Sequence, residues 1–452
     1  MLVIIHGWSD DYTSFETLGN LLIREGVTDR VAHVRLGNYI SMDDEVRMDD
    51  IVAALNTAWD NEPTLSWKPR SVDVIVHSTG GLVIRHWLAQ MKPEKVPIKR
   101  LVMLAPANFG SPLAHTGRSF IGRVVKGWKT ERPFETGTHV LKALELASPY
   151  SWDLAFDDRF TTKQYYGPGR VLCTVLVGNT GYSGISALAN KPGTDGTVRV
   201  STANLNCAYL EADFTHDPKA PVTKSKNGKG SIAFGVMDGE NHGTVAAKQG
   251  GPENDDTLPA IVEALGVTDQ DFPIWCQELE VNADAVMAAR TDDGLHYHGF
   301  QNTVFKVEDQ FGNAIDDYVI EIYLDEKSKT SRNAHVTQKI QEDVIAGVHA
   351  YGDDPSMRSM LIDCDALYRL LDKKDEKLKI SLTAHPVYGD GNDVGYRTFT
   401  DNDIGNVELS YKQVRKIFQP NRTLLVKIIL RRFQSNKVFE FKKLKKDASF
   451  EI

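Results

Sequence analysis

Short apolar runs alternate with segments of helical periodicity through the first part of the chain. Residues 72–76 form a β-branched apolar run, which is typical of a strand buried on both faces of a sheet. Similar runs lie at residues 2–5, 31–36, 101–105, 171–177 and 231–236. Between them, apolar residues recur at helical spacing within residues 15–24, 46–59, 82–90 and 258–265. This order of strands and helices predicts a doubly wound, mostly parallel α/β sheet.

The pattern changes in the last third of the chain. Apolar and polar positions now alternate over short stretches, as in half-buried strands, and turns rich in Asp, Gly and Asn separate them. These stretches lie at residues 303–313, 318–324, 378–384, 405–410 and 424–433. They predict an all-β, sandwich-like domain of about 150 residues. We therefore expect an α/β domain at residues 1–265, a mixed, acidic linker at 266–295 and an accessory β domain at 296–452.

Composition adds limits on the class of protein. A chain of 452 residues is too long for a single compact core, which agrees with two domains. The net charge of −9 gives no support to a nucleic-acid partner. The basic tail at residues 437–446 is a local exception, and it fits either a solvated edge strand or a patch for anionic lipid. The four cysteines are too widely spaced for a zinc motif or a disulfide framework, and Cys173 lies in an apolar run typical of a core position.

The amino terminus carries no pattern of an export signal. The apolar run after Met1 is too short for the core of a signal peptide, and no basic leader precedes it. No apolar run reaches the length of a membrane span. We therefore expect a soluble protein that is cytoplasmic when made, with export by a signal-independent route left open.

The predicted strand at residues 72–76 leads into the most informative motif of the chain. Ser78 stands between this strand and a helix, and Gly80 and Gly81 follow it. A serine on such a turn is held in a strained conformation that lifts its hydroxyl clear of the sheet. The usual pattern is G-x-S-x-G, but Val76 occupies the first glycine position here. The motif predicts a catalytic nucleophile, and the alternative is an ordinary strand-to-helix turn.

Two further residues complete a candidate triad. Asp195 lies in a glycine-rich loop after the strand at 171–177, and His242 follows the strand at 231–236. The chain order Ser, Asp, His is the order of α/β-hydrolases, and loops at the carboxyl ends of parallel strands can bring such residues together. Rivals to these two residues remain open, and they are Asp213, Asp217 and Asp238 for the carboxylate, and His115 and His216 for the base.

In combination, these residues resemble bacterial lipases and esterases of the α/β-hydrolase superfamily. The resemblance covers about the first 265 residues and is carried by the turn at Ser78, by Asp195 and His242, and by the segments at 6–8 and 109–113. It implies an α/β-hydrolase fold with a Ser78–His242–Asp195 triad. It also implies an oxyanion hole formed by the backbone N–H groups of Trp8 and Thr79, with His6 as a structural histidine. The accessory β domain is not covered by the resemblance.

The resemblance further implies a cap insertion at about residues 114–169. Its many aromatic and leucine residues fit either a mobile lid over an acyl chain or a helical excursion packed on the domain. We expect a lipase or phospholipase acting on acyl esters, without a cofactor. A short-chain carboxylesterase, a polyester depolymerase and a non-catalytic binding protein remain alternatives. The accessory domain would suit contact with a membrane surface or a protein. Some related lipases hold a structural calcium, for which the candidate ligands here are Asp238, Glu240, Asp255 and Asp256.

Overall fold

A computed structural model was used to locate these elements in space. It describes residues 1–6, 15–41, 43–116, 137–183, 190–289, 299–324, 334–371, 377–389, 391–399 and 407–439. Within these ranges, no helix combines the length and the apolar character that a membrane span requires. The expected oxyanion residue Trp8, residues 117–136 of the expected insertion and the tail beyond residue 439 lie outside the described residues.

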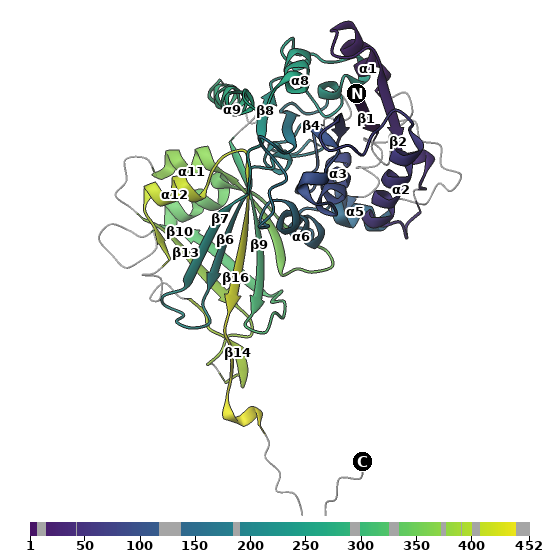
Figure 1. Ribbon diagram of the computed structural model, residues 1–452. Helices are drawn as coiled ribbons and strands as arrows, with labels where there is room; N and C mark the ends of the chain where they lie inside the picture. The colour runs from purple at the N-terminus through teal and green to yellow at the C-terminus, as the bar shows by residue number, and fades with distance from the viewer. Residues whose placement is uncertain are drawn as a thin grey trace, which may run out of the picture.

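The buried apolar runs form one parallel sheet of six strands, in the order β2-β1-β3-β4-β5-β8 (Figure 1). The bounds are Leu2–His6 for β1, Val31–Arg35 for β2, Val72–His77 for β3, Ile98–Leu104 for β4, Leu172–Gly178 for β5 and Ala233–Met237 for β8. Every neighbouring pair is parallel. The prediction of a doubly wound parallel sheet is confirmed, because the helical segments return the chain across the sheet after successive strands.

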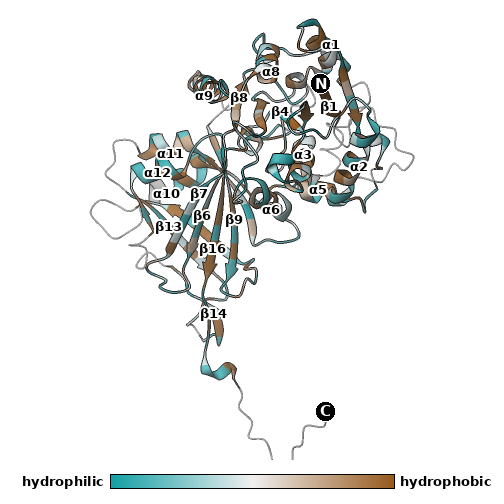
Figure 2. Cartoon of the chain, viewed as in Figure 1, coloured by the Kyte–Doolittle hydropathy of each residue, from teal (hydrophilic) through white to brown (hydrophobic). Residues whose placement is uncertain are grey.

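The helices of this domain begin close to where the periodicity places them. They are α1 (Glu16–Arg24), α2 (Met48–Asn61), α3 (Gly80–Ala89) and α8 (Thr257–Gly266). A further helix, α9 (Phe272–Ala288), lies in the expected linker and was not predicted. The apolar faces of these helices and the strands form one continuous hydrophobic core. Trp59 of α2 and Trp87 of α3 meet in this core with their ring centroids 5.0 Å apart. The hydrophobic colour along β1 in Figure 2 marks the same buried centre.

The described half of the insertion consists of two packed helices, α5 (Thr138–Leu144) and α6 (Pro149–Asp158). Asp158, at the end of α6, accepts two hydrogen bonds from the guanidinium of Arg85 on α3, at 2.8 and 3.0 Å. Both side chains are fully buried. This part of the insertion is therefore fastened to the helix that follows Ser78, as expected of a packed excursion.

The accessory domain contains two principal sheets. The larger has the order β11-β12-β9-β16-β6-β7 and the smaller has the order β10-β13-β15. The bounds are Phe300–Asp309 for β9, Tyr318–Tyr323 for β10, Ile345–Ala350 for β11, Met357–Asp363 for β12, Leu378–Ala384 for β13, Glu408–Leu409 for β15 and Arg422–Leu430 for β16. A small pair, β14 (Val394–Tyr396) and β17 (Arg432–Gln434), projects away from the rest of the domain (Figure 1). The prediction of an additional β domain is confirmed.

The accessory domain also contains features that the alternating pattern did not predict. It includes the helices α10 (Ala334–Lys339), α11 (Cys364–Leu371) and α12 (Tyr411–Ile417). In the larger sheet, β16 runs parallel to both of its neighbours, β9 and β6, so this sheet is mixed rather than antiparallel. Short helices between strands escape detection because they offer too few turns for a clear period.

The two domains share a sheet. β6 (Ala208–Asp213) and β7 (Val222–Asn227) lie within the first 265 residues, yet they extend the larger sheet of the accessory domain. All six residues of β7 are exposed and mostly polar, so no apolar pattern identified the strand. In the expected linker, α9 packs against β8, and Trp275 Nε1 donates to Thr174 Oγ1 of β5 at 3.0 Å.

Candidate active site

Ser78 occupies a strained turn between β3 and α3. Its φ angle of +54° lies in the left-handed region that residues with a side chain rarely adopt. A Cβ on Gly81 would lie 2.6 Å from Cβ of Pro106, so the helix passes this loop too closely for any side chain. A Cβ on Gly80 would lie 3.2 Å from Cβ of Val76. The missing first glycine of the motif is thus accommodated because the residue facing Val76 is itself a glycine.

A continuous chain of hydrogen bonds links the three candidate residues. Ser78 Oγ lies 3.0 Å from Nε2 of His242, and Nδ1 of His242 lies 3.0 Å from Oδ2 of Asp195. Ser78 follows β3, Asp195 lies on the loop after β5, and His242 lies on the loop after β8. The three residues therefore meet at the carboxyl end of one parallel sheet, where loops from separate strands converge. All three are buried, with Asp195 at 0% exposure.

The loop that carries Asp195 holds its carboxylate in place. Asp195 Oδ1 accepts hydrogen bonds from the backbone N–H groups of Thr197 at 2.9 Å and Val198 at 2.8 Å. The neighbouring Gly196 has a φ angle of +95°, which the tight turn requires. The backbone N–H of His242 donates to the Asp195 carbonyl oxygen at 2.8 Å, which ties the two loops together. One carboxylate oxygen is bound by amides, and the other faces the imidazole.

His77 is a residue of this site that the motif search did not identify. It precedes Ser78, is 1% exposed, and its ring lies against that of His242 with the centroids 4.6 Å apart. Its Nε2 lies 2.8 Å from the His242 carbonyl oxygen, and its Nδ1 lies 3.3 Å from Nζ of Lys248. Burial, with Lys248 and His242 nearby, lowers the pKa of His77 well below 6.5. A neutral ring that donates through Nε2 and accepts at Nδ1 satisfies both contacts.

His77 was hard to find from the sequence. A histidine at the end of a strand has no spacing signal, and its partner Lys248 lies on a later loop. The neutral ring of His77 fixes the carbonyl of His242 and so helps to hold that residue in position.

The expected oxyanion groups are only partly described. Thr79 is the N-cap residue of α3 and is 2% exposed, so its backbone N–H lies at the positive end of the helix directly after Ser78. The second expected donor, Trp8, lies outside the described residues. His6, at the end of β1, places Nε2 3.0 Å from Nδ1 of His33, and its ring meets Phe15 edge-on. These contacts fit the structural part expected of His6.

The rival residues make other contacts. Asp213 accepts from the backbone N–H of Thr215, and Asp217 accepts from that of Lys219, as turn aspartates often do. Asp238 accepts from Asn179 Nδ2 at 2.7 Å. The ring of His115 lies 5.1 Å from that of His349, on the accessory domain. The structure therefore brings Asp195 and His242, and none of these four rivals, into hydrogen-bond contact with one another and Ser78.

The candidate calcium ligands do not converge in the described part of the chain. Glu240 Oε1 accepts from the backbone N–H groups of Glu253 and Asn254, each at 2.9 Å, and from Thr257 Oγ1 at 2.8 Å. Its buried carboxylate thus already fastens the loop that leads to α8. The described residues contain no cluster of three or more His, Cys, Asp or Glu side chains suited to a metal ion.

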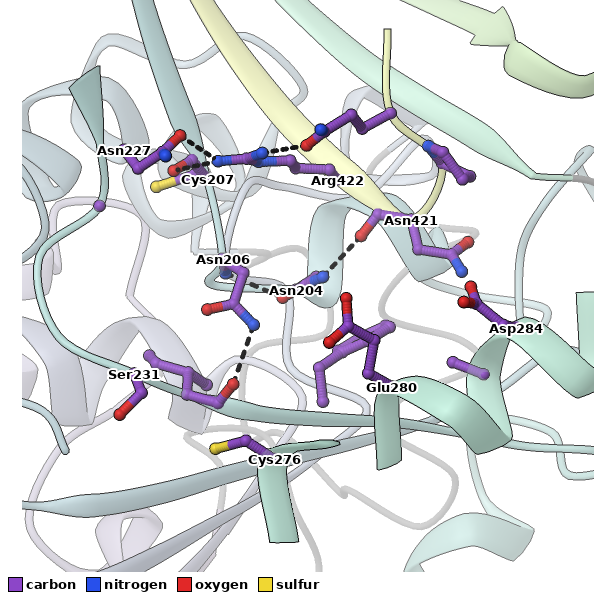
Figure 3. A pocket seen from close by; sticks show the side chains of 16 residues that line it. Asn204, Asn206, Cys207, Asn227, Ser231, Cys276, Glu280, Asp284, Asn421 and Arg422 are labelled. Carbon is purple, nitrogen blue, oxygen red and sulfur yellow. Dashed lines mark hydrogen bonds between the residues drawn. The ribbon is translucent and has the colours of Figure 1, made fainter. Parts of the chain in front are cut away.

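A separate polar hollow of about 420 Å³ lies where the two domains meet (Figure 3). Arg422 donates there to the Cys207 carbonyl oxygen at 3.3 Å and to Asn227 Oδ1 at 2.6 Å. Asn204 Nδ2 donates to the Asn421 carbonyl oxygen at 2.7 Å. The walls include residues at the amino-terminal end of β8, whereas Ser78 and His242 lie at carboxyl ends. The hollow is therefore part of the domain junction and lies apart from the candidate triad.

Comparisons with known proteins show which known structures this chain resembles. No protein-family model matches the sequence, and no curated protein matches it. Among solved structures, phospholipase PlaB from Legionella pneumophila matches with a TM-score of 0.79 and 23% identity, covering 100% of this chain and 98% of that one. A structure of PlaB in complex with thio-NAD gives a TM-score of 0.78 and 22% identity, with the same coverage.

The likeness to PlaB extends over both domains, so the α/β-hydrolase fold with an appended β domain is a known architecture. At 23% identity this likeness shows the fold alone, and it confirms the predicted α/β-hydrolase fold. The match to a metagenomic carboxyl esterase covers 63% of this chain and 75% of the esterase chain, at 15% identity. Its TM-score of 0.34 is too low to support a structural argument.

Proposed function

We propose that this protein is a serine hydrolase of carboxylic esters, with Ser78 as the nucleophile, His242 as the general base and acid, and Asp195 as the residue that orients the imidazole. The observation that carries the proposal is the chain of two 3.0 Å contacts from Ser78 through His242 to Asp195. A serine hydroxyl becomes an effective nucleophile when an imidazole takes its proton. A carboxylate on the far nitrogen holds the required tautomer and stabilises the imidazolium.

The reaction follows from these positions. Ser78 Oγ attacks the ester carbonyl carbon while its proton passes to Nε2 of His242. The backbone N–H of Thr79, with that of Trp8, stabilises the negative charge on the carbonyl oxygen. The bond to the alcohol then breaks, and the alcohol leaves with the proton from His242. Water attacks the resulting acyl-enzyme, gives its proton to His242 and releases the carboxylic acid, and Ser78 regains its proton.

A lipid ester, such as a phospholipid, is the substrate class we propose. The apolar side chains of α5 and α6 are buried in the core of the domain, so the described part of the insertion does not itself indicate the substrate. The whole-chain likeness to a protein described as a phospholipase makes phospholipids the first class to test. The proposal requires no cofactor, because the serine, histidine and aspartate supply the nucleophile and the proton transfers.

A serine-directed phosphonate probe tests the nucleophile. We expect it to label the wild-type protein at Ser78, and we expect Ser78→Ala to lose both labelling and ester hydrolysis. Ser71→Ala is the matched control, because this serine stands just before the other end of the same strand and bonds the Lys68 carbonyl oxygen. Intact hydrolysis by a folded Ser78→Ala variant would refute the proposal.

A second experiment separates the substrate classes. Hydrolysis of p-nitrophenyl esters of increasing chain length is measured with and without phospholipid vesicles. A long-chain optimum, together with release of fatty acid from the vesicles, is the expected result. A short-chain optimum with no release from vesicles would instead indicate a carboxylesterase or a polyester depolymerase. Absence of hydrolysis on every ester by a folded protein would indicate a non-catalytic binding protein.

A further inference from the structure

A cavity of about 360 Å³ lies between the two principal sheets of the accessory domain. Side chains alternate between the faces of a strand, so every second residue of β16 points inward. Leu424, Val426 and Ile428 line one wall of the cavity, and Ile320 of β10 with Ile380 and Leu382 of β13 line the wall opposite. The inward positions of β16 span four residue steps, or roughly 13 Å. The cavity is therefore lined mostly by apolar side chains of two facing sheets.

The other face of the larger sheet is occupied by the α/β domain. Tyr209, on the outward face of β6, meets Phe156 of α6 with the ring centroids 5.1 Å apart. Val304 of β9 and Leu425 of β16 belong to the continuous core of the α/β domain. The cavity consequently lies on the side of this sheet that faces away from Ser78.

The cavity divides the core of the accessory domain. Its buried apolar residues form two separate clusters, one around Ile362 and Phe418 and the other around Val426 and Phe399. Members of both clusters line the cavity. Several inward apolar side chains remain partly exposed because the void leaves them without full contact, and these are Leu210, Ala212, Phe305, Ile320 and Ile380. Protein interiors are normally close-packed, so an apolar space of this size calls for an occupant.

We propose that this cavity binds one linear acyl chain. Its volume is within the range of about 300 to 1,000 Å³ that is usual for ligand pockets, and its lining is mostly apolar with a few polar groups, as in such pockets. The preference for an acyl chain over other apolar molecules rests on the proposed function, because hydrolysis of a lipid ester releases a fatty acid and a lysolipid. Either product carries a single unbranched chain, which an elongated apolar space between two facing sheets can accept.

Polar and charged residues lie near one edge of the cavity. Glu408 of β15 borders the cavity and forms ion pairs with Lys377 at 2.7 Å and Lys379 at 3.1 Å. The hydrogen bond from Lys377 lowers the pKa of Glu408, so the three groups together carry one net positive charge. Thr223 of β7 and Gln413 of α12, both exposed, also line the cavity. Thr223 and Gln413 mark the opening. Glu408 pairs in register with Lys379, which alternates with the inward-facing Ile380, so these ion-paired side chains lie on the outer face of the smaller sheet and do not enter the cavity.

The test uses the full chain with its catalytic serine blocked by a small alkyl phosphonate, so that an acyl chain cannot bind at Ser78. Fluorescence of cis-parinaric acid, a fluorescent fatty acid, measures binding. Ile320→Trp fills the cavity, and its neighbour Val319→Trp is the matched control because Val319 is 51% exposed on the outer face of the same strand. We expect saturable binding to the blocked wild type and to Val319→Trp, with affinity at least about tenfold lower in Ile320→Trp.

Competition by palmitate and by lysophosphatidylcholine distinguishes the two sources of the chain. Stronger displacement by palmitate assigns the site to the free acid, whereas stronger displacement by the lysolipid assigns it to the other product. Thermal unfolding and near-ultraviolet circular dichroism check that Ile320→Trp is folded. If it is not, Ala212→Leu on the opposite wall takes its place.

Absence of saturable binding, or equal affinity in the cavity and control variants, would overturn the acyl-chain site. These outcomes are distinct from failure of the proposed function, which appears as absence of labelling at Ser78. If Ser78 is not labelled, the fatty-acid affinities of Ile320→Trp and Val319→Trp are compared on the unblocked protein. This comparison still tests the cavity because neither variant touches the candidate triad.

Discussion

The two domains bury their apolar residues in different ways. In the α/β domain, one continuous cluster extends from β1 to α9 and surrounds the strands that carry Ser78, Asp195 and His242. In the accessory domain, two clusters remain apart, and a cavity of about 360 Å³ lies between them. A hydrogen-bonded triad needs side chains held by close packing on every side. A binding cavity needs the opposite, which is a rigid wall with space left in front of it. The packing thus separates a part suited to chemistry from a part suited to binding.

The largest expected effect tests whether the closely packed domain performs the chemistry. Asp195→Asn keeps the size of the side chain but removes the charge that selects the tautomer of His242. We expect kcat for ester hydrolysis to fall by about 10⁴-fold, with little change in the free energy of unfolding. Steady-state kinetics and urea unfolding measure the two quantities. An unchanged kcat would show that His242 does not depend on Asp195.

The next effect tests how firmly the insertion is fastened to the helix behind Ser78. Arg85→Met leaves Asp158 as a buried carboxylate without its ion-pair partner, although Tyr166 still donates to it at 2.9 Å. We expect the free energy of unfolding to fall by about 3 to 5 kcal/mol, as measured by urea unfolding. The double variant Arg85→Met with Asp158→Leu removes both charges and should recover part of this loss. No recovery would mean that the contact of Arg85 with the Asn108 carbonyl oxygen, at 2.7 Å, is the more important one.

A smaller effect concerns the neutral histidine beside the base. Because the pKa of His77 lies well below 6.5 in the folded protein, the unfolded chain binds a proton there that the folded chain excludes. The free energy of unfolding should therefore fall as the pH drops below 6.5, by at most about 1.4 kcal/mol per pH unit from this group. His77→Asn should reduce that slope, and unfolding from about pH 7 to about pH 5 measures it. Equal slopes in the variant and the wild type would show that His77 is protonated alike in both states.

The smallest effect compares the packing of the two domains directly. Ala212→Leu adds volume at the cavity and should raise the free energy of unfolding by about 0.5 to 2 kcal/mol. Ala155→Leu makes the same change on α6, where Ala155 is 0% exposed in the continuous core, and should lower it by about 1 to 3 kcal/mol. Urea unfolding of both variants measures the two changes in the free energy of unfolding. Effects of the same sign would show that the space in the accessory domain closes in solution.

Much of the α/β domain could be predicted because its signals are local. The run at Val72–His77 is buried on both faces, and the turn at Ser78 needs small residues directly after it. Features that leave no local signal in the sequence were missed. The polar strand β7 is exposed along its whole length and so carries no apolar pattern, and His77 is defined by contacts with His242 and Lys248, which lie more than a hundred residues away. Such contacts leave no period or motif in the sequence.

The sequence by itself determined where the buried strands and amphipathic helices lie, and it selected Ser78, Asp195 and His242 as candidates, because burial and tight turns restrict the residue type at each position. Only the tertiary structure decided which loops meet, that β6 and β7 belong to the sheet of the accessory domain, and that this domain retains a cavity. Those properties depend on distances between segments far apart in the chain. Side-chain volume on one strand does not reveal whether the opposite sheet approaches closely enough to fill the space.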